Sequence, residues 1–146
     1  MKRHESLIPL SREHHGALIL ARLLQTGAPA YKGLPADPAG KANYALKFYE
    51  DELAQHFIQE EKMVSVLKDI NPRLGILLRE MAEEHVLLRV LFSQINNPAD
   101  LSAHLDQLGK ALEKHVRKEE REIFPLIQDS CSPHILDELS ALFLEQ

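Results

Sequence analysis

Two stretches of the chain place a glutamate four residues after a histidine. They are His56 with Glu60 and His115 with Glu119, and a second glutamate follows each pair. On an α-helix, residues i and i+4 lie on one face about one turn apart. An imidazole nitrogen and a carboxylate oxygen placed in this way can meet at one metal ion. The spacing therefore predicts metal ligation from two helices.

A lone histidine, preceded by a glutamate, lies upstream of each pair. The first pair has Glu13 and His14 before it, and the second has Glu84 and His85. The chain thus contains two copies of one pattern: a lone histidine on one helix and a His-x-x-x-Glu pair on the next. We expect two similar helical hairpins to close around a pair of metal ions.

Four long segments carry apolar residues at helical spacing. They run from a cap at Ser11 to Gly27, from about Pro38 to Asp69, from about Pro72 to Ile95, and from about Asp100 to a kink or an end near Pro125. A short helix after Ser132 and Pro133 is expected to pack as a lid on one end. Long helices with short connections become antiparallel neighbours. The prediction is an all-α, up-down-up-down four-helix bundle with a short C-terminal helix, forming a single domain over residues 1–146.

The ionisable residues of both motifs lie on the apolar stripes of their helices. Buried charge is costly unless it is paired or bound to a metal. The depths also match: His14 and His85 each lie about 11 residues before the end of their helices, and His56 and His115 about 15 residues after the start of theirs. At ~1.5 Å per residue, both hairpins place their ligands at the same height.

Imidazole and carboxylate ligands suit iron, manganese or zinc, and the lone Cys131 argues against a structural zinc site built from cysteines. Six ligands are too many for one tetrahedral zinc ion, but they suit two octahedral ions. Glu60 and Glu119 would bridge the ions, and two histidines would complete each site. The predicted metal ligands are His14, His56, Glu60, His85, His115 and Glu119.

The first helix offers a second candidate, because His15 directly follows His14 and lies about 100° around the helix. Aligning Glu13-His14 with Glu84-His85 matches the apolar positions better and favours His14. His15 stays the alternative ligand. The histidine that does not bind the metal would either contact a metal ligand or lie at an entrance to the metal site.

Several charged residues near the motifs have two open interpretations. Glu61 and Glu120 either orient an imidazole on a neighbouring helix or form salt bridges at the surface. Arg89 either neutralises one of these carboxylates or extends into solvent. His134 and Glu138 repeat the spacing a third time in the short last helix, and we expect them to be surface groups.

Composition excludes several classes of partner. The 146 residues carry a net charge of -5 with no block of Lys or Arg, which argues against nucleic acid. No apolar run approaches the roughly 20 residues needed to cross a bilayer, so we expect no membrane association. A single cysteine and no apolar leader segment indicate a reducing, cytoplasmic location.

The order and spacing of these ligands resemble the hemerythrin-like, or HHE cation-binding, family over about residues 7 to 127. The resemblance implies a four-helix bundle holding a non-haem di-iron centre. Oxygen-carrying members of that family have a further histidine one turn after the one on the third helix, where this chain has Arg89. Four histidines and two glutamates are more similar to the repair-of-iron-centres and iron-sensing members.

The resemblance therefore implies a protein with two iron ions, although manganese or zinc would also suit the ligands. We expect it to bind, sense or react with O2, NO or reactive oxygen species such as peroxide. Two alternatives stay open at this point: an iron storage or donor protein for iron-centre repair, and a di-iron oxidoreductase. The sequence does not separate binding from turnover, and it leaves open a redox partner or a homodimer.

Overall fold

The computed structural model describes residues 2–145, and helices account for the regular structure of that part of the chain. The elements are α1 (Ile8–Leu24), α2 (Pro38–Phe48), η1 (Tyr49–Leu53), α3 (Ala54–Leu67), α4 (Pro72–Ser93), α5 (Leu101–Lys118), η2 (Glu119–Ile123), α6 (Phe124–Ser130) and α7 (Pro133–Leu144). The short π-helical segments η1 and η2 join their neighbours without a break. The elements α2, η1 and α3 thus form one long helix, and α5, η2 and α6 form another.

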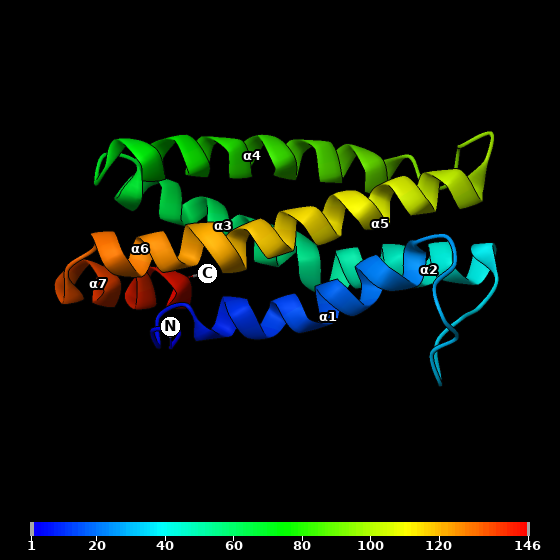
Figure 1. The fold of residues 1–146 in the computed structure, drawn as a ribbon, viewed down its shortest axis with the longest axis horizontal. Coiled ribbons are helices and arrows are strands. Elements are labelled where there is room, and N and C mark those ends of the chain that lie inside the picture. The colour runs from blue at the N-terminus through cyan, green and yellow to red at the C-terminus, as the bar shows by residue number, and fades with distance from the viewer. Residues whose placement is uncertain (1, 146) are drawn as a thin grey trace.

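The four long helices run alternately in opposite directions (Figure 1). Going along the chain, α1 leads away from the N-terminus, α2 to α3 returns, α4 leads out again, and α5 to α6 returns. The short helix α7 packs against α3 at the end of the bundle where the N-terminus lies. The predicted all-α, up-down-up-down bundle with a short C-terminal helix is confirmed.

Side-chain caps set the start of most helices. Asp37, Asn71, Asp100 and Ser132 each accept a hydrogen bond from a backbone N–H in the first turn that follows. Those N–H groups have no partner within their own helix, so a cap removes the cost of leaving them unpaired.

The predicted cap at Ser11 is wrong. Helix α1 begins at Ile8, with Leu7 at the capping position and no side-chain cap. Proline is well suited to the first turn of a helix, and Pro9 there allows an earlier start. The hydroxyl of Ser11 instead donates to Glu120, 2.9 Å away.

The predicted end of the first helix also differs from the structure. Helix α1 ends at Leu24 rather than at Gly27, which lies in the following turn at φ 81°. The fourth long helix continues past Pro125 and ends at Ser130, within a few residues of the proline, as predicted. Proline lacks the N–H that closes a helical turn. The helix nevertheless continues, with the π-helical segment η2 ending directly before Phe124 and Pro125.

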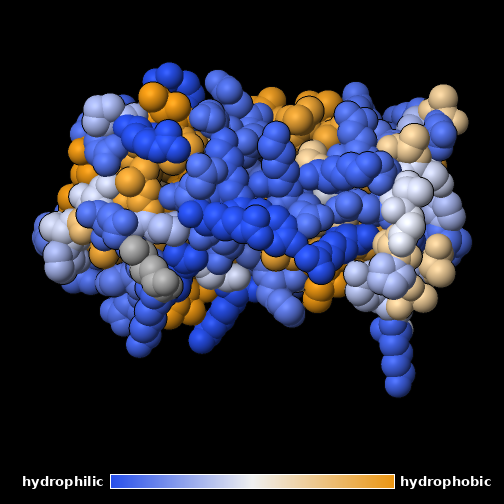
Figure 2. Space-filling model, viewed as in Figure 1, coloured by the Kyte–Doolittle hydropathy of each residue, from blue (hydrophilic) through white to orange (hydrophobic). Residues whose placement is uncertain are grey.

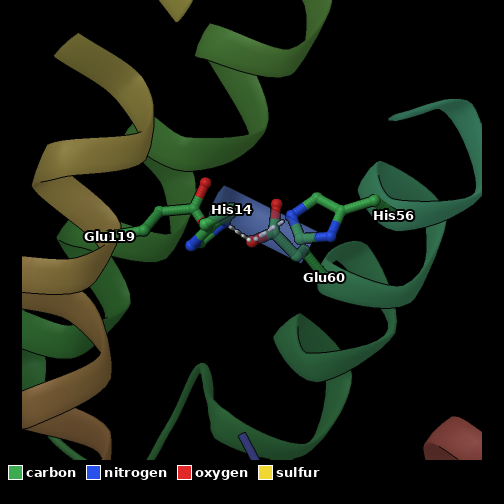
Figure 3. Close-up of side chains that lie close together, drawn as sticks. All are labelled: His14, His56, Glu60 and Glu119. Carbon is green, nitrogen blue, oxygen red and sulfur yellow. Dashed lines mark ion pairs between the residues drawn. The ribbon is translucent and has the colours of Figure 1, made fainter. Parts of the chain in front are cut away.

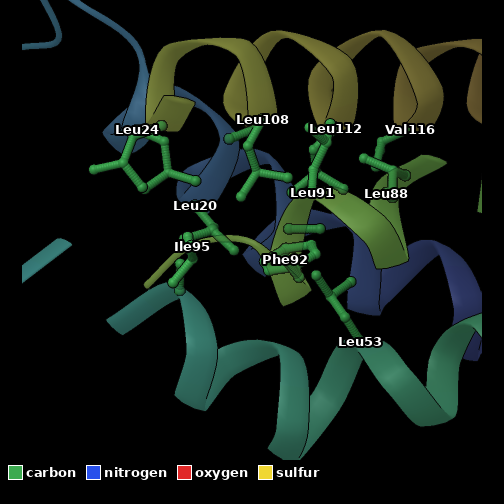
Figure 4. Close-up of a cluster of buried hydrophobic side chains, with 14 of the residues drawn as sticks. Leu20, Leu24, Leu53, Leu88, Leu91, Phe92, Ile95, Leu108, Leu112 and Val116 are labelled. Carbon is green, nitrogen blue, oxygen red and sulfur yellow. The ribbon is translucent and has the colours of Figure 1, made fainter. Parts of the chain in front are cut away.

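The core consists of two apolar clusters, one toward each end of the bundle. One, shown in Figure 4, includes Leu20, Phe92 and Leu108. The other includes Met63, Leu74 and Phe124, together with residues of α7. On every long helix the predicted ligands lie between residues of the first cluster and residues of the second. A layer of polar side chains therefore separates the two halves of the core.

The surface of the bundle is mostly polar on the side shown in Figure 2, where hydrophilic residues cover the middle of the molecule. In the part of the chain that the structure describes, no helix combines the length and the apolar character needed to span a membrane.

Candidate metal centre

Six ionisable side chains meet in the polar layer, and they come from all four long helices. Each is at most 2% exposed. They are His14 from α1, His56 and Glu60 from α3, His85 from α4, His115 from α5 and Glu119 at the start of η2. The structure thus brings together the six residues predicted from the sequence.

The six residues form two groups of four that share both glutamates. One group is His14, His56, Glu60 and Glu119, and the other is Glu60, His85, His115 and Glu119. Within each group, one ligand atom from every residue lies within 4.8 Å of the others. Figure 3 shows the first group, with the side chains directed toward one another from different helices.

Each glutamate directs its two oxygens to different histidines. Oε2 of Glu60 lies 3.1 Å from Nε2 of His56 and 3.3 Å from Nε2 of His14, while Oε1 lies 3.0 Å from Nε2 of His85. Glu119 divides in the same way, with Oε2 3.7 Å from His14 and Oε1 in contact with His115. A carboxylate between two pairs of imidazoles, with one oxygen toward each pair, has the arrangement of a bridge between two metal ions.

Although some of these atoms lie close together, many of them form no hydrogen bond of the kind that buried polar atoms require. Among residues 2–145, no hydrogen-bond partner is found for Nε2 of His14, His56 and His115, for Oε2 of Glu60, or for either carboxylate oxygen of Glu119. Leaving one such group unsatisfied costs about 1–3 kcal/mol, and more if it is charged. Buried lone pairs of nitrogen and oxygen converging on two points fit a pair of cations.

The other nitrogen of two histidines is held within its own hairpin. Nδ1 of His56 lies 3.0 Å from Oε1 of Glu13, and Nδ1 of His115 lies 2.7 Å from Oε1 of Glu84. Sequence reasoning missed this role for Glu13 and Glu84. The available signal was the glutamate that precedes the lone histidine in both copies of the repeat.

The remaining two histidines are held across the hairpins. Nδ1 of His85 lies 2.7 Å from Glu61, and Nδ1 of His14 lies 3.0 Å from Glu120. Of the two interpretations of Glu61 and Glu120, the structure supports orientation of an imidazole. We call Glu13, Glu61, Glu84 and Glu120 the outer carboxylates. An N–H that donates to a carboxylate leaves the opposite ring nitrogen free to bind a metal and fixes the ring in place.

Three of the outer carboxylates form an ion pair with an arginine or a lysine. Arg89 contacts both oxygens of Glu61, at 2.8 and 3.0 Å. Lys118 lies 3.1 Å from Glu84, and Arg3 lies 3.4 Å from Glu120. Arg89 therefore neutralises a carboxylate, which settles the choice left open by the sequence.

The carboxylates change the proton affinity of the histidines. Burial by itself lowers the pKa of His14, but Glu120, Glu60 and Glu119 outweigh it and raise the pKa to about 9. Burial is likewise outweighed at His115, where Glu119 and Glu84 raise the pKa to about 10. Protons and a metal cation thus compete for the same imidazoles.

The two shared glutamates differ from each other in proton affinity. Burial raises the pKa of Glu60, but the neighbouring imidazoles, led by His56, hold it well below its usual range. Burial and the charge of Glu60 raise the pKa of Glu119. When no cation is bound, Glu60 therefore carries the negative charge more readily than Glu119.

Aromatic rings cover the imidazoles on both sides. Phe57 stacks on His85 with ring centroids 4.3 Å apart and meets His115 edge-on at 5.9 Å. Phe124 stacks on His14 at 5.5 Å. These rings keep water from the faces of the ligands, which strengthens electrostatic interactions at the centre.

The structure corrects the alternative choice of His15 as a ligand. His15 is exposed, because the rotation of about 100° per residue turns it away from the core when His14 faces inward. His134 and Glu138 form the expected surface pair, 3.0 Å apart and 83% and 51% exposed. None of these three residues belongs to either group of four.

Comparison with protein families gives one match. The family model described as the hemerythrin HHE cation-binding domain matches residues 9–127, a range that contains all six buried ligand candidates and the four outer carboxylates. No curated protein and no solved structure matches the chain.

Proposed function

The chain belongs to the hemerythrin HHE cation-binding family, and on that premise we propose that it holds a non-haem di-iron centre that binds O2, NO or peroxide. The observation that carries the proposal is the pair of four-residue groups that share Glu60 and Glu119. Two ions bound side by side would use both groups at once. One ion alone would leave several of the buried ligand atoms unsatisfied.

The ligands divide evenly in this proposal. His14 and His56 bind one iron ion, His85 and His115 bind the other, and Glu60 and Glu119 bridge the two. Each ion then has four protein ligand atoms, which leaves room for a small molecule at an octahedral ion. Imidazole with carboxylate suits iron, and manganese or zinc would also be accepted.

A bound pair of iron ions supplies electrons to a small oxidising ligand. The side chains around the ligands orient the imidazoles and exclude water. The outer carboxylates retain the Nδ1 protons and fix the imidazole rings, and Phe57 and Phe124 exclude bulk water. Arg89 pairs with Glu61 where oxygen-carrying relatives are expected to have a further ligand. A more open coordination favours sensing of, or reaction with, the small molecule over simple carriage.

An iron donor for the repair of iron centres is a second candidate. It is favoured by the outer carboxylate Glu13, which holds His56 while its side chain is 49% exposed. Because the carboxylate that holds His56 is accessible from the surface, this ligand is suited to releasing a metal. For either role we propose a cytoplasmic location, in keeping with the single free Cys131.

Metal analysis with optical spectroscopy tests the proposal. Protein loaded with ferrous iron under anaerobic conditions should bind about two irons per chain, one for each group of four ligands. Exposure to O2, NO or peroxide should then produce ligand-to-metal charge-transfer bands. A single zinc ion per chain with a featureless spectrum would reject the proposal. Turnover assays with a reductant would separate an oxidoreductase from a binding protein.

A further inference from the structure

The two hairpins repeat their metal-site residues with one informative difference. Glu13 corresponds to Glu84, and His56 corresponds to His115. Three residues after each of these histidines, the second hairpin has Lys118, whereas the first has Gln59. A cation on one side of the centre is thus replaced by a neutral amide on the other.

The substitution leaves Glu13 open to solvent. Lys118 covers Glu84 at 3.1 Å, and the side chain of Glu84 is 27% exposed. Glu13 holds His56 in the equivalent way but is 49% exposed, and no lysine or arginine of residues 2–145 forms an ion pair with it. Each of the other two outer carboxylates, Glu61 and Glu120, has an arginine within ion-pair distance.

Two surface cavities meet at Glu13. One, of about 580 Å³, lies among α1, α3 and α7, and the other, of about 400 Å³, lies between α1 and the η1–α3 region. Both are lined by Arg12, Glu13 and Gln55. We call the two together the Glu13 groove. It places open space beside the carboxylate that holds His56.

Gln59 forms part of the wall of this groove. Its Nε2 donates to the backbone carbonyl of Phe143 in α7, 3.1 Å away. Its Oε1 is buried and has no partner within the described chain. The groove therefore presents the carboxylate of Glu13, and a buried amide oxygen without a partner lies in its wall; both are groups that a hard divalent cation accepts as ligands.

We propose that metal ions enter and leave the centre through the Glu13 groove, with Glu13 as their first contact. This inference rests on the proposed function. The carboxylates of Glu5, Glu13 and Glu52 outnumber the single Arg12 in the groove, while Asp51 is paired with Lys47. An excess of negative charge in a cleft raises the local concentration of cations. An ion at Glu13 is then separated from the centre by one imidazole, that of His56.

Exchanging the residues that differ between the hairpins tests the route. Gln59→Lys places the cation of the second hairpin beside Glu13, and Lys118→Gln is the reciprocal change. The probe is cobalt(II), mixed rapidly with metal-depleted protein at low ionic strength and followed by its visible absorption. Gln59→Lys should slow loading by about tenfold, on the scale of electrostatic steering. Lys118→Gln should load at least as fast as the parent protein.

Two further pairs of variants make the result independent of how well Gln59→Lys folds. Gln55→Lys adds a cation at an exposed position of the groove, and Lys114→Gln changes the equivalent position of the second hairpin. Glu13→Gln and Glu84→Gln each remove one outer carboxylate. We expect slower loading for Gln55→Lys but not for Lys114→Gln. Both carboxylate variants lose a group that holds an imidazole, so we expect Glu13→Gln to slow loading more than Glu84→Gln does. Equal slowing by Glu13→Gln and Glu84→Gln would mean that Glu13 only positions its histidine, and would overturn the route.

The experiment separates this inference from the proposed function. If the parent protein does not bind about two cobalt ions per chain at equilibrium, the proposed pair of sites fails. If it binds both ions, but Gln59→Lys and Gln55→Lys load at the parent rate, the pair of sites stands and the entry route is wrong. Added salt should slow loading of the parent protein more than loading of Glu13→Gln.

Discussion

Glu60 and Glu119 are fully buried and belong to both groups of ligands, so a change at either residue affects two metal sites at once. Glu60→Gln keeps the size of the side chain but replaces an oxygen with an NH2 group that cannot bind a metal. We expect it to weaken binding of both ions, and isothermal titration with cobalt(II) would measure this. Glu122→Gln is the control, because Glu122 is exposed and pairs with Arg73 at the surface. Unchanged affinity for both ions in Glu60→Gln would contradict the bridging role.

The role of the outer carboxylates is tested by two glutamates that share one lysine. Lys118 contacts Glu80 and Glu84, each at 3.1 Å, but only Glu84 also holds an imidazole, that of His115. Removing a group that orients a ligand typically costs 10–100-fold in metal affinity, so Glu84→Gln should raise the Kd by about that factor. Glu80→Gln should leave it within about twofold, since it loses only a surface ion pair. A similar loss of metal affinity in both variants would show that the negative charge, and not the contact with His115, determines the affinity.

Proton competition gives a pH dependence with a definite sign. The pKa of His14 is raised to about 9 and that of His115 to about 10, so both imidazoles hold protons near neutral pH when no metal is bound. Glu60 and Glu13 also outweigh burial at His56 and raise its pKa. Because a metal binds the neutral ring, loading near pH 7 should release at least two protons. Titration calorimetry in buffers of different ionisation enthalpy would count them. No proton release would contradict the ligand assignment.

The same shifts act on the stability of the metal-depleted chain. A histidine whose folded pKa lies above its unfolded value of about 6.5 stabilises the fold fully below that pH. That contribution is lost as the pH rises through about 9 for His14 and about 10 for His115. The free energy of unfolding of chelator-treated protein should therefore fall between about pH 6.5 and 10, as measured by urea denaturation. A constant or rising free energy over that range would contradict the assignment.

At the scale of the elements, α1 and α5 pack closely and bring His14 and His115 to the centre. Their backbones approach at Gly109, where an added Cβ would lie 2.5 Å from the carbonyl oxygen of Ala21. Gly109→Ala must push the helices apart and should cost about 1–3 kcal/mol of unfolding free energy.

Gly16→Ala is the matched control for this prediction. At Gly16 the nearest atoms to an added Cβ belong to side chains and not to backbone: the Phe48 ring at 3.2 Å and Oε2 of Glu52 at 4.0 Å. Because alanine also favours a helix by up to about 1 kcal/mol over glycine, this change should be nearly neutral. Urea denaturation measures both variants. Equal stabilities would show that the approach of the two backbones does not constrain the bundle.

The elements also show what a sequence can predict. The bundle and its six inward ionisable residues follow from apolar stripes interrupted by histidine and glutamate at matched depths. The choice between His14 and His15 followed from the internal repeat, because both hairpins obey the same rotation per residue. The repeat pointed to Glu13 and Glu84, but which imidazole each one holds depends on distances between helices and could not be derived. The predicted cap at Ser11 was wrong because Pro9 allows the first helix to begin earlier.

Across the whole molecule, the polar layer between the two apolar clusters leads us to expect that a bound metal stabilises the fold. Cations that bind the native state and not the unfolded chain stabilise the fold by mass action. The loaded protein should therefore melt at a higher temperature than protein treated with a chelator, as measured by calorimetry. An unchanged Tm would indicate a helical bundle that does not need a metal. The assignment of residues 1–146 to one domain stays a prediction.

We propose that two metal ions lie between Glu60 and Glu119, each held by one pair of histidines. An anomalous difference map at the iron absorption edge, from crystals of the protein loaded with ferrous iron and grown without added zinc, tests it most directly. We predict two peaks, one beside His14 and His56 and the other beside His85 and His115. A single peak, or peaks elsewhere in the molecule, would contradict the account.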